Sequence, residues 1–442
     1  MKTSTKNLVL SAAILSALTA SAASITGISA NQRWPWNNLV DVDFTISGSS
    51  ASMAYRIELS ATYNGGENKV YANSYLTEPV VEGDGPKRVT WDLGADCPGL
   101  KIDDFTITVA ATPLVGNDIP VYMVIDLSSG KDSVKYPVRY TTKAPDLGND
   151  KCRTMELWLR RIKAGSEFYM GGNDSGMTTY LPEAKKMRLT KDFYMAIFET
   201  TQQQWAQVMG TWPSYYSNQT YRAARPVESI SRSDMRGTFY YYPWPNDNSQ
   251  NKAGVVGIST FAGKIRARTG LNKFDLPTEA QWVYAALGGS VETTGSVSKR
   301  GIYPAVGPIG DNEVRKVARC GGTNGSGNGG GIADGDVGIS EDPNDTTGTM
   351  TVGHYHPNAY GLYDMLGNVW EMVLDRWAAG WPEEVDPVDY KGPAAGEHSV
   401  LKGLPYSWST YYYSVRARVE FETIDQAKNP GMVGARFCVT LD

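Results

Sequence analysis

The chain has 442 residues, of which 41% are hydrophobic and 20% charged, and its formal net charge at pH 7 is −5. This length allows two or three domains with complete cores. The mildly acidic charge argues against nucleic acid or an anionic membrane as the partner.

The first 22 residues have the pattern of a secretory signal peptide. Two lysines come first, an apolar run over residues 8–20 follows, and Ala-Ser-Ala at 20–22 supplies small residues for cleavage. The apolar run is too short to span a bilayer, and no later segment is long and apolar enough to be a transmembrane span. We therefore expect residues 1–22 to be removed and the mature protein to be secreted, periplasmic or exposed at the cell surface.

Residues 25–145 are expected to form an all-β, immunoglobulin-like sandwich. Several segments alternate apolar and polar residues, which is the period of a half-buried strand, and turn-forming clusters such as NGGEN and EGDGP separate them. Short strands at this spacing are typical of such a sandwich. Strands are predicted at 41–48, 55–63, 69–76, 88–94, 104–111, 121–129 and 134–142.

A linker is predicted at residues 143–154, because the stretch KAPDLGND is polar and contains Pro and Gly. Helices are predicted after it, at 200–210, 259–270 and 277–289, each with a Ser or Thr near its start and a Gly near its end. In the last of them, Thr278 and Gln281 have the spacing of a capping box. The loop at 320–349 is rich in Gly and Asp, and loops of this length are usually functional or disordered.

The four cysteines leave the disulfide pattern open. They are Cys97, Cys152, Cys320 and Cys438. Export permits disulfides, and four cysteines allow three complete pairings between which the sequence does not choose. No CxxC spacing occurs, so neither a zinc site nor a redox motif is indicated.

Seven motifs follow one another between residue 155 and the C-terminus. They are GSEFYMGG (165–172), FYMAIFETTQQQWAQVMG (193–210), RPVESIS (225–231), LPTEAQWVYAALGG (276–289), NAYGLYDMLGNVWEMVLDRW (358–377), KGLPYSW (402–408) and GARFCV (434–439). In this order they resemble the formylglycine-generating enzyme family, also called the sulfatase-modifying factor family. The resemblance implies an α+β, C-type-lectin-like fold with little regular structure over residues 155–442.

The resemblance also implies where a copper site would lie. Active members of the family hold copper with two cysteines that follow a Lys-Gly-Gly-Ser strand. Here Lys402 and Gly403 align with that strand, and Trp408 and Tyr413 stand where the cysteines would be. Soft thiolates bind Cu(I), whereas indole and phenol do not replace them. We therefore predict that the chain makes no formylglycine and that copper is not a cofactor.

Iron is not expected either. A second branch of the family holds iron with three histidines in an HxxxHxE-type motif, but this chain has only His354, His356 and His398, and they lack that spacing. We interpret them as histidines without a metal. An oxidoreductase of the same family that uses a rearranged metal site remains the alternative function.

The resemblance implies a structural calcium ion in the motif GLYDMLGNVWE. Asp364 and Glu371 would supply carboxylates, and Gly367 and Val369 would supply backbone carbonyls. Calcium takes six to eight such oxygen ligands. The other interpretation that remains open is a capped turn whose acidic side chains accept hydrogen bonds from backbone amides.

The stretch PYSWSTYYYS (405–414) predicts a ligand-binding face, and GTFYYYPWPN (237–246) has a similar composition. Tyr and Trp give large, rigid contact areas, and Ser adds adaptable hydrogen bonds, as in antibody paratopes and binding hot spots. The alternative is that these rings face the core, since strand side chains alternate between faces. The predicted ligand-binding residues are Tyr406, Trp408, Tyr411, Tyr413 and Trp370, of which Trp370 is included because the resemblance places it beside the active cleft.

The favoured function is therefore a secreted, non-catalytic protein that binds a protein, peptide or glycan through its sulfatase-modifying-factor-like domain. The resemblance implies that some relatives with this fold are variable ligand-binding proteins. A structural or surface-adhesive role of the two domains is the remaining hypothesis.

Overall fold

The structure is a computed structural model of the chain. It describes residues 23–32, 38–48, 53–76, 79–101, 104–114, 120–172, 183–237, 256–292, 299–310, 313–321, 348–393, 396, 398–409, 412–421 and 431–441. The chain divides into two compact units, which are described separately. The first comprises residues 1–121 and 135–143, and the second comprises residues 122–134 and 144–442.

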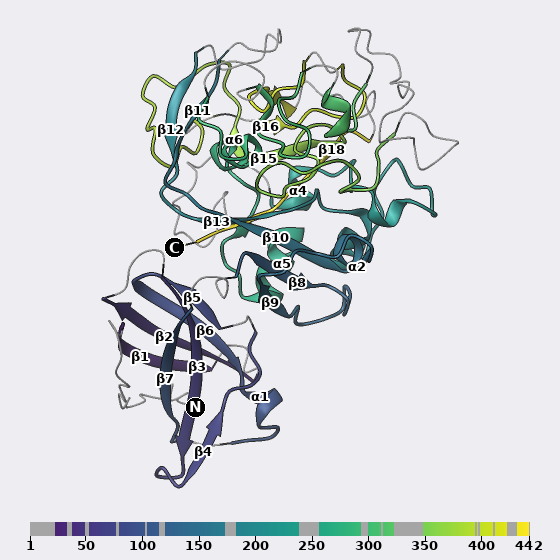
Figure 1. The fold of residues 1–442 in the computed structure, drawn as a ribbon. Coiled ribbons are helices and arrows are strands. Elements are labelled where there is room, and N and C mark those ends of the chain that lie inside the picture. Colours follow the sequence, from purple (N-terminus) through teal and green to yellow (C-terminus); the bar gives the residue numbers. More distant parts are fainter. Residues whose placement is uncertain are drawn as a thin grey trace. The chain divides into compact units, whose positions relative to one another are not determined.

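The first unit contains two antiparallel sheets (Figure 1). In one sheet the order is β1-β2-β6, and in the other β3 pairs with β4, β5 and β7. The elements of this unit are β1 (Ser24–Gln32), β2 (Leu39–Ser47), β3 (Ala54–Tyr63), β4 (Asn68–Tyr71), β5 (Val80–Glu82), β6 (Gly85–Asp92), α1 (Leu93–Asp96), β7 (Thr106–Leu114) and β9 (Val138–Thr141).

Both sheets of the first unit contribute side chains to one hydrophobic core. Phe44 and Trp91 come from one sheet, and Ile57, Leu59 and Ile107 come from the other. Buried and more exposed residues alternate along much of β3 and the end of β2, as expected for strands with one face on a core. The all-β character of this region agrees with the sequence, and an immunoglobulin-like arrangement of the strands stays a prediction.

The second unit is built around a sheet in which β14, β19, β13, β10 and β8 lie side by side in that order. These strands are β14 (Phe274–Asp275), β19 (Cys438–Thr440), β13 (Phe193–Ala196), β10 (Glu156–Ile162) and β8 (Tyr122–Asp126). The sequence had grouped residues 121–129 with the sandwich. The structure places residues 122–134 in the second unit, because β8 pairs with β10 and the Tyr122 ring packs edge-on against Trp158 at 5.8 Å.

The three predicted helices of the second unit are present, and each end lies within two residues of its predicted position. They are α3 (Gln202–Met209), α5 (Phe261–Thr269) and α6 (Glu279–Leu287). Thr278 and Gln281 form the predicted capping box of α6. All three helices end at a residue in the left-handed conformation. This residue is a glycine in each case, since an L side chain is strained there. Shorter helices are α2 (Lys151–Thr154), α4 (Arg232–Met235), η2 (Arg222–Ala224) and η3 (Glu313–Lys316).

The motif GLYDMLGNVWE forms an irregular loop that leads into a second sheet. Gly361, Asp364, Gly367 and Asn368 all have a positive φ, which excludes a helix. The sheet has the order β17-β16-β15-β18, and β11 pairs with β12 in a separate ribbon. These strands are β11 (Glu167–Met170), β12 (Lys185–Arg188), β15 (Trp370–Arg376), β16 (Ser399–Lys402), β17 (Val419–Glu420) and β18 (Val433–Gly434).

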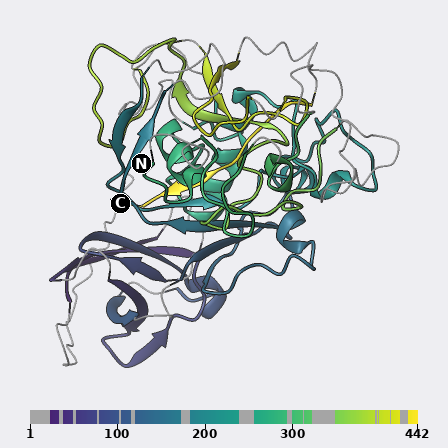
Figure 2. The ribbon, with the colours of Figure 1, turned by 45° about the horizontal axis from the view of Figure 1, so that its top comes forward.

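Irregular segments connect these short elements and make up much of the second unit (Figures 1 and 2). This mostly β architecture with few helices is compatible with the fold that the sequence predicts for residues 155–442. Among the residues that the structure describes, no helix is long and apolar enough to cross a membrane.

Candidate binding face

The end of the GLYDMLGNVWE motif is fixed by a buried ion pair. Arg436 contacts Glu371 at 2.7 Å between Nη2 and Oε1, and both side chains are completely buried. The indole Nε1 of Trp282 donates a hydrogen bond of 2.7 Å to Glu371 Oε2. Because both carboxylate oxygens already have donors, Glu371 is part of the scaffold on which the loop rests.

A second buried carboxylate organises the middle of the motif. Glu199 accepts hydrogen bonds from Asn368 Nδ2 at 2.7 Å and from the backbone N–H of Val369 at 3.1 Å. Asp364 Oδ2 accepts from the backbone N–H of Gly353 at 2.7 Å. Burial raises the pKa of Glu199 well above its ordinary value, and the nearby Asp364 and Glu371 carboxylates raise it further.

These contacts test whether the predicted calcium ligands fit the ion. Among the described residues, Asp364 Oδ1 is buried without a hydrogen-bond partner, as a metal ligand could be. Glu371, however, is neutralised by Arg436, whose positive charge would repel a cation at the same oxygens. The set Asp364, Gly367, Val369 and Glu371 therefore does not fit a calcium ion as arranged here. Calcium binding itself stays a prediction of the family resemblance.

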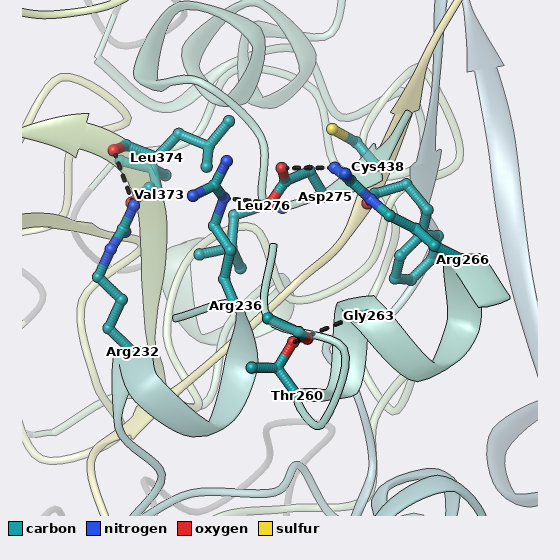
Figure 3. Close-up of polar contacts among 12 residues, drawn as sticks. Arg232, Arg236, Thr260, Gly263, Arg266, Asp275, Leu276, Val373, Leu374 and Cys438 are labelled. Atoms are coloured by element: carbon teal, nitrogen blue, oxygen red, sulfur yellow. Dashed lines mark hydrogen bonds and ion pairs between the residues drawn. The ribbon is translucent and has the colours of Figure 1, made fainter. Parts of the chain in front are cut away.

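Another buried polar cluster lies beside β15 (Figure 3). Asp275 pairs with Arg236 at 2.7 Å and with Arg266 at 2.8 Å. Arg232 donates to the carbonyls of Val373 and Leu374 in β15. Cys438 is buried near Asp275 and Arg266, and burial raises the pKa of its thiol.

The chain reverses direction at the end of β16. Lys402 is buried against Glu279, which also pairs with Arg418 at 3.1 Å. Gly403 and Leu404 then take positive φ values of 92° and 70°. Leu404 thus keeps a left-handed backbone where the resemblance expects a second glycine, and its side chain is fully buried. After this turn, the backbone N–H of Tyr406 donates to the carbonyl of Asn368 at 2.9 Å, so the segment stays beside the start of β15.

Hydrogen bonds hold the segment that follows the turn. The Tyr413 hydroxyl donates to the carbonyl of Pro405 at 2.7 Å, and the backbone N–H of Trp408 donates to the same carbonyl at 3.1 Å. The backbone N–H of Gly321 donates to the Trp408 carbonyl at 2.7 Å. Tyr413 is fully buried, and burial raises the pKa of its phenol well above the ordinary value.

Aromatic rings from two distant segments meet beside this turn. Tyr216 packs edge-on against Tyr406 with a centroid distance of 5.4 Å, and their hydroxyl oxygens are 2.5 Å apart. Tyr215 contacts Tyr216 at 5.1 Å, and Trp408 contacts Tyr412 at 5.9 Å. We call this set the aromatic face, and its members are Tyr215, Tyr216, Tyr406, Trp408 and Tyr412. Tyr215 is its most exposed member, at 60%.

The structure divides the predicted ligand-binding residues. Trp408 is half-buried and belongs to the aromatic face, and Tyr406 joins the face through its hydroxyl contact with Tyr216, although the residue is only 8% exposed. Trp370 and Tyr413 lie beneath it, because both side chains are fully buried and Trp370 contacts Trp408 edge-on at 5.5 Å. Tyr411 lies outside the described residues, as do residues 238–246 of the second aromatic stretch.

The sequence reasoning missed Tyr215 and Tyr216. The segment TWPSYYSNQTY (211–221) is rich in Tyr, Trp and Ser, as residues 405–414 are, and this composition was the available signal. What the sequence did not reveal is that the two segments meet, since they are separated by almost 200 residues.

The histidines and cysteines form no metal group in the described part of the chain, where no three His, Cys, Asp or Glu side chains are arranged to hold an ion. His398 Nδ1 lies 2.5 Å from Glu420 Oε1, and the His354 ring packs against Tyr355. None of the four cysteines is disulfide-bonded in the structure.

Residues 159–440 match the family of sulfatase-modifying factor enzyme 1-like domains. The chain belongs to this family. The formylglycine-generating enzyme of Thermomonospora curvata is 33% identical over 173 residues, which cover 37% of this chain and 46% of the relative. The formylglycine-generating enzyme of Mus musculus is 30% identical over 184 residues, which cover 40% of each chain. The chain therefore spans less than half the length of these enzymes.

Among solved structures, Treponema denticola variable protein 1 is similar at 25% identity and a TM-score of 0.43, over 67% of this chain and 98% of that one. PvdO from Pseudomonas aeruginosa is similar at 18% identity and a TM-score of 0.38, over 64% of this chain and 95% of that one.

Within this sulfatase-modifying factor domain, the positions of the thiols bear on copper chemistry. Cys320 precedes Gly321, whose N–H binds the Trp408 carbonyl, so one thiol lies near the aromatic face. Cys438 lies in β19, buried beside Asp275 and Arg266. Two thiolates that bind one Cu(I) ion must reach the same point, whereas Cys320 lies in an irregular segment and Cys438 lies in β19.

Proposed function

We propose that the chain is an exported, non-catalytic member of the sulfatase-modifying factor family that binds a protein, peptide or glycan through its aromatic face. Export rests on the signal-peptide pattern of residues 1–22, which lie outside the described structure. The remaining parts of the proposal rest on the second unit.

The observation that carries the binding function is the aromatic face itself. Hydroxyl-bearing and indole rings are gathered from two distant segments, and they are fixed by hydrogen bonds and edge-on ring contacts. Rings with a polar group suit a surface that is partly apolar and partly wet. Rings that are already ordered lose little conformational entropy when a ligand binds, so they favour affinity.

The five rings of the aromatic face carry no charge, which restricts the ligand, and the neighbouring Arg222 guanidinium stacks on the Trp212 ring at 4.0 Å. The segments 211–221 and 405–413 contain no Asp, Glu, Lys or Arg. Exposed charge pairs are screened by salt, whereas ring stacking is not. We therefore expect a ligand surface that is neutral, and binding that changes little when the ionic strength is raised.

The absence of catalysis is supported by the side chains at the copper positions. Trp408 and Tyr413 stand where the family resemblance places the two cysteines, and neither side chain provides a soft thiolate. Purified protein mixed with Cu(I) and a cysteine-containing peptide should leave the peptide unoxidised. Tight binding of one Cu(I) ion together with oxidation of the peptide would favour the alternative function, an oxidoreductase with a rearranged metal site.

The binding half of the proposal is tested on an array of neutral oligosaccharides and uncharged peptides. The wild-type protein should bind a subset of the array, and Trp408→Ala should lose that binding. Equal signals from both proteins would contradict the proposal and leave a structural or adhesive role.

A further inference from the structure

The segment that presents Tyr215 and Tyr216 has no helix or strand of its own, so side chains from neighbouring elements hold it. The indole Nε1 of Trp205 donates to Thr211 Oγ1 at 3.1 Å. Gln202 Nε2 donates to the Tyr216 carbonyl at 2.9 Å. Both donors belong to α3. Together they fix the two ends of the segment 211–216 but leave the orientation of the peptide between Tyr215 and Tyr216 to another group.

That group is the buried carboxylate of Glu228. Its Oε2 accepts from the backbone N–H of Tyr215 at 3.0 Å, and its Oε1 accepts from the N–H of Tyr216 at 2.9 Å. The Ser229 hydroxyl donates to Oε2 at 2.8 Å. Hydrogen bonds to an ionised acceptor are stronger than neutral ones, and burial excludes water as a competitor. One side chain, that of Glu228, therefore binds the backbone amides of both tyrosines.

Fixing two successive amides sets the directions of both side chains. Tyr215 is directed outward and is 60% exposed. Tyr216 is directed to Tyr406, where the two hydroxyls meet at 2.5 Å. Gly431 leaves room for this placement, since a Cβ there would lie 2.4 Å from the Tyr216 ring. Without the carboxylate, the two N–H groups would lose these acceptors, and the backbone that carries both rings would be less constrained.

We propose that Glu228 is the positioning residue of the aromatic face, and that the ligand-contacting surface extends from residues 405–413 to the Tyr215–Tyr216 corner. This inference rests on the proposed binding function. Glu228 touches no ligand itself. It orders Tyr215 and Tyr216 before the ligand arrives, and pre-ordered contact residues bind more tightly because less conformational entropy is lost.

The test compares Glu228→Ala, Glu228→Gln and the wild type. The first readout is amide hydrogen exchange at Tyr215 and Tyr216, which needs no ligand. Exchange should accelerate about tenfold or more in Glu228→Ala, because both amides lose a charge-assisted bond. Glu228→Gln should fall between the two proteins, because an amide offers one acceptor oxygen in place of two.

The second readout is binding to the array of neutral oligosaccharides and uncharged peptides. The array signal of Glu228→Ala should fall about tenfold at a fixed protein concentration, the equivalent of losing one strong hydrogen bond. The matched control is Asp96→Ala in the first unit. Asp96 also accepts from two successive backbone amides, those of Asn73 and Ser74. This control should lower stability but leave the array signal unchanged.

The outcomes separate the two proposals. Loss of binding in Trp408→Ala with unchanged binding and exchange in Glu228→Ala would overturn the role of Glu228 alone. Unchanged binding in Trp408→Ala would overturn the binding function, and the positioning role with it. Equal loss of array signal in Glu228→Ala and Asp96→Ala would show a general effect of destabilisation, which also contradicts the inference.

Discussion

Single residues in the GLYDMLGNVWE loop are fixed by close backbone packing. Gly367 has a φ of 89°, and a Cβ at this position would lie 2.2 Å from the carbonyl oxygen of Arg319. An L side chain is strained at this φ, and here it would also collide with backbone that has little freedom to move. The glycine is therefore a structural requirement of the loop.

We expect Gly367→Ala to lower the free energy of unfolding by about 3 kcal/mol or more, since backbone strain and a steric clash add. Urea unfolding measures the change. Gly380→Ala is the matched control, because a Cβ at Gly380 meets no atom within 4 Å and should change stability by less than about 0.5 kcal/mol. Equal effects of the two substitutions would contradict the loop geometry.

Calcium can be tested on the same loop. With Glu371 paired to Arg436, the arrangement predicts that Asp364→Ala leaves the response of the melting temperature to Ca²⁺ and to a chelator unchanged. A rise in the melting temperature with Ca²⁺ that Asp364→Ala abolishes would contradict this expectation. That result would support the calcium site implied by the family resemblance and would require Glu371 to leave Arg436.

At the scale of secondary structure, a carboxylate from β15 supports the start of α6. Asp375 Oδ2 accepts from the backbone N–H of Glu279, the first residue of the helix, at 2.6 Å. Burial raises the pKa of Asp375 to about 7, and the neighbouring Glu279 contributes in the same direction. The N-terminal end of a helix favours an acceptor at this place.

This pKa predicts how stability depends on pH. A folded-state pKa above the unfolded value means that the folded protein binds a proton that the unfolded chain releases. The contribution of Asp375 is therefore fully present at pH below about 4 and is lost as the pH rises through about 7. Asp375→Asn, which keeps an acceptor oxygen, should flatten the pH dependence of the melting temperature across this range.

The control for that experiment is Asp132→Asn, whose side chain is 86% exposed in the wild type. It should leave the pH dependence as it is in the wild type. If Asp375→Asn has the same pH dependence as the wild type, the raised pKa of Asp375 is wrong.

Elements with local signals were predicted well from the sequence, and elements with distant partners were not. Helices α3 and α6 have their predicted ends, because a capping Thr, a Gln three residues later and a final Gly act within a few residues. The sequence missed β1 and β5. It also grouped β8 with the sandwich, although β8 pairs with β10, because strand pairing depends on residues far along the chain.

The candidate site shows the same limit. Composition predicted aromatic contacts within residues 405–414 but did not separate Trp408, which is half-buried, from Tyr413, which lies in the core. The hydrogen bond from Tyr413 to the Pro405 carbonyl keeps the Tyr413 ring in the core. This bond depends on the turn at Gly403 and Leu404. Tyr216 meets Tyr406 across 190 residues, which no local pattern reveals.

At the scale of the whole molecule, the chain combines an all-β unit with a sulfatase-modifying factor domain. The buried ion pairs of that domain hold the GLYDMLGNVWE loop and the β16 turn, and the aromatic face lies where the two distant segments meet. The scaffold is the part that identifies the family. The face, with Trp408 and Tyr406 beside Tyr216, is the part on which the proposed binding function depends.

The most direct test of this account is a calorimetric titration with the strongest-binding neutral oligosaccharide or uncharged peptide from the array. Trp408→Ala and Tyr215→Ala should each weaken the affinity about tenfold or more, as removal of a central aromatic contact does. Tyr71→Ala, which removes a ring that is 61% exposed in the first unit, is the control and should bind as the wild type does. Unchanged affinity in both face variants would contradict the account.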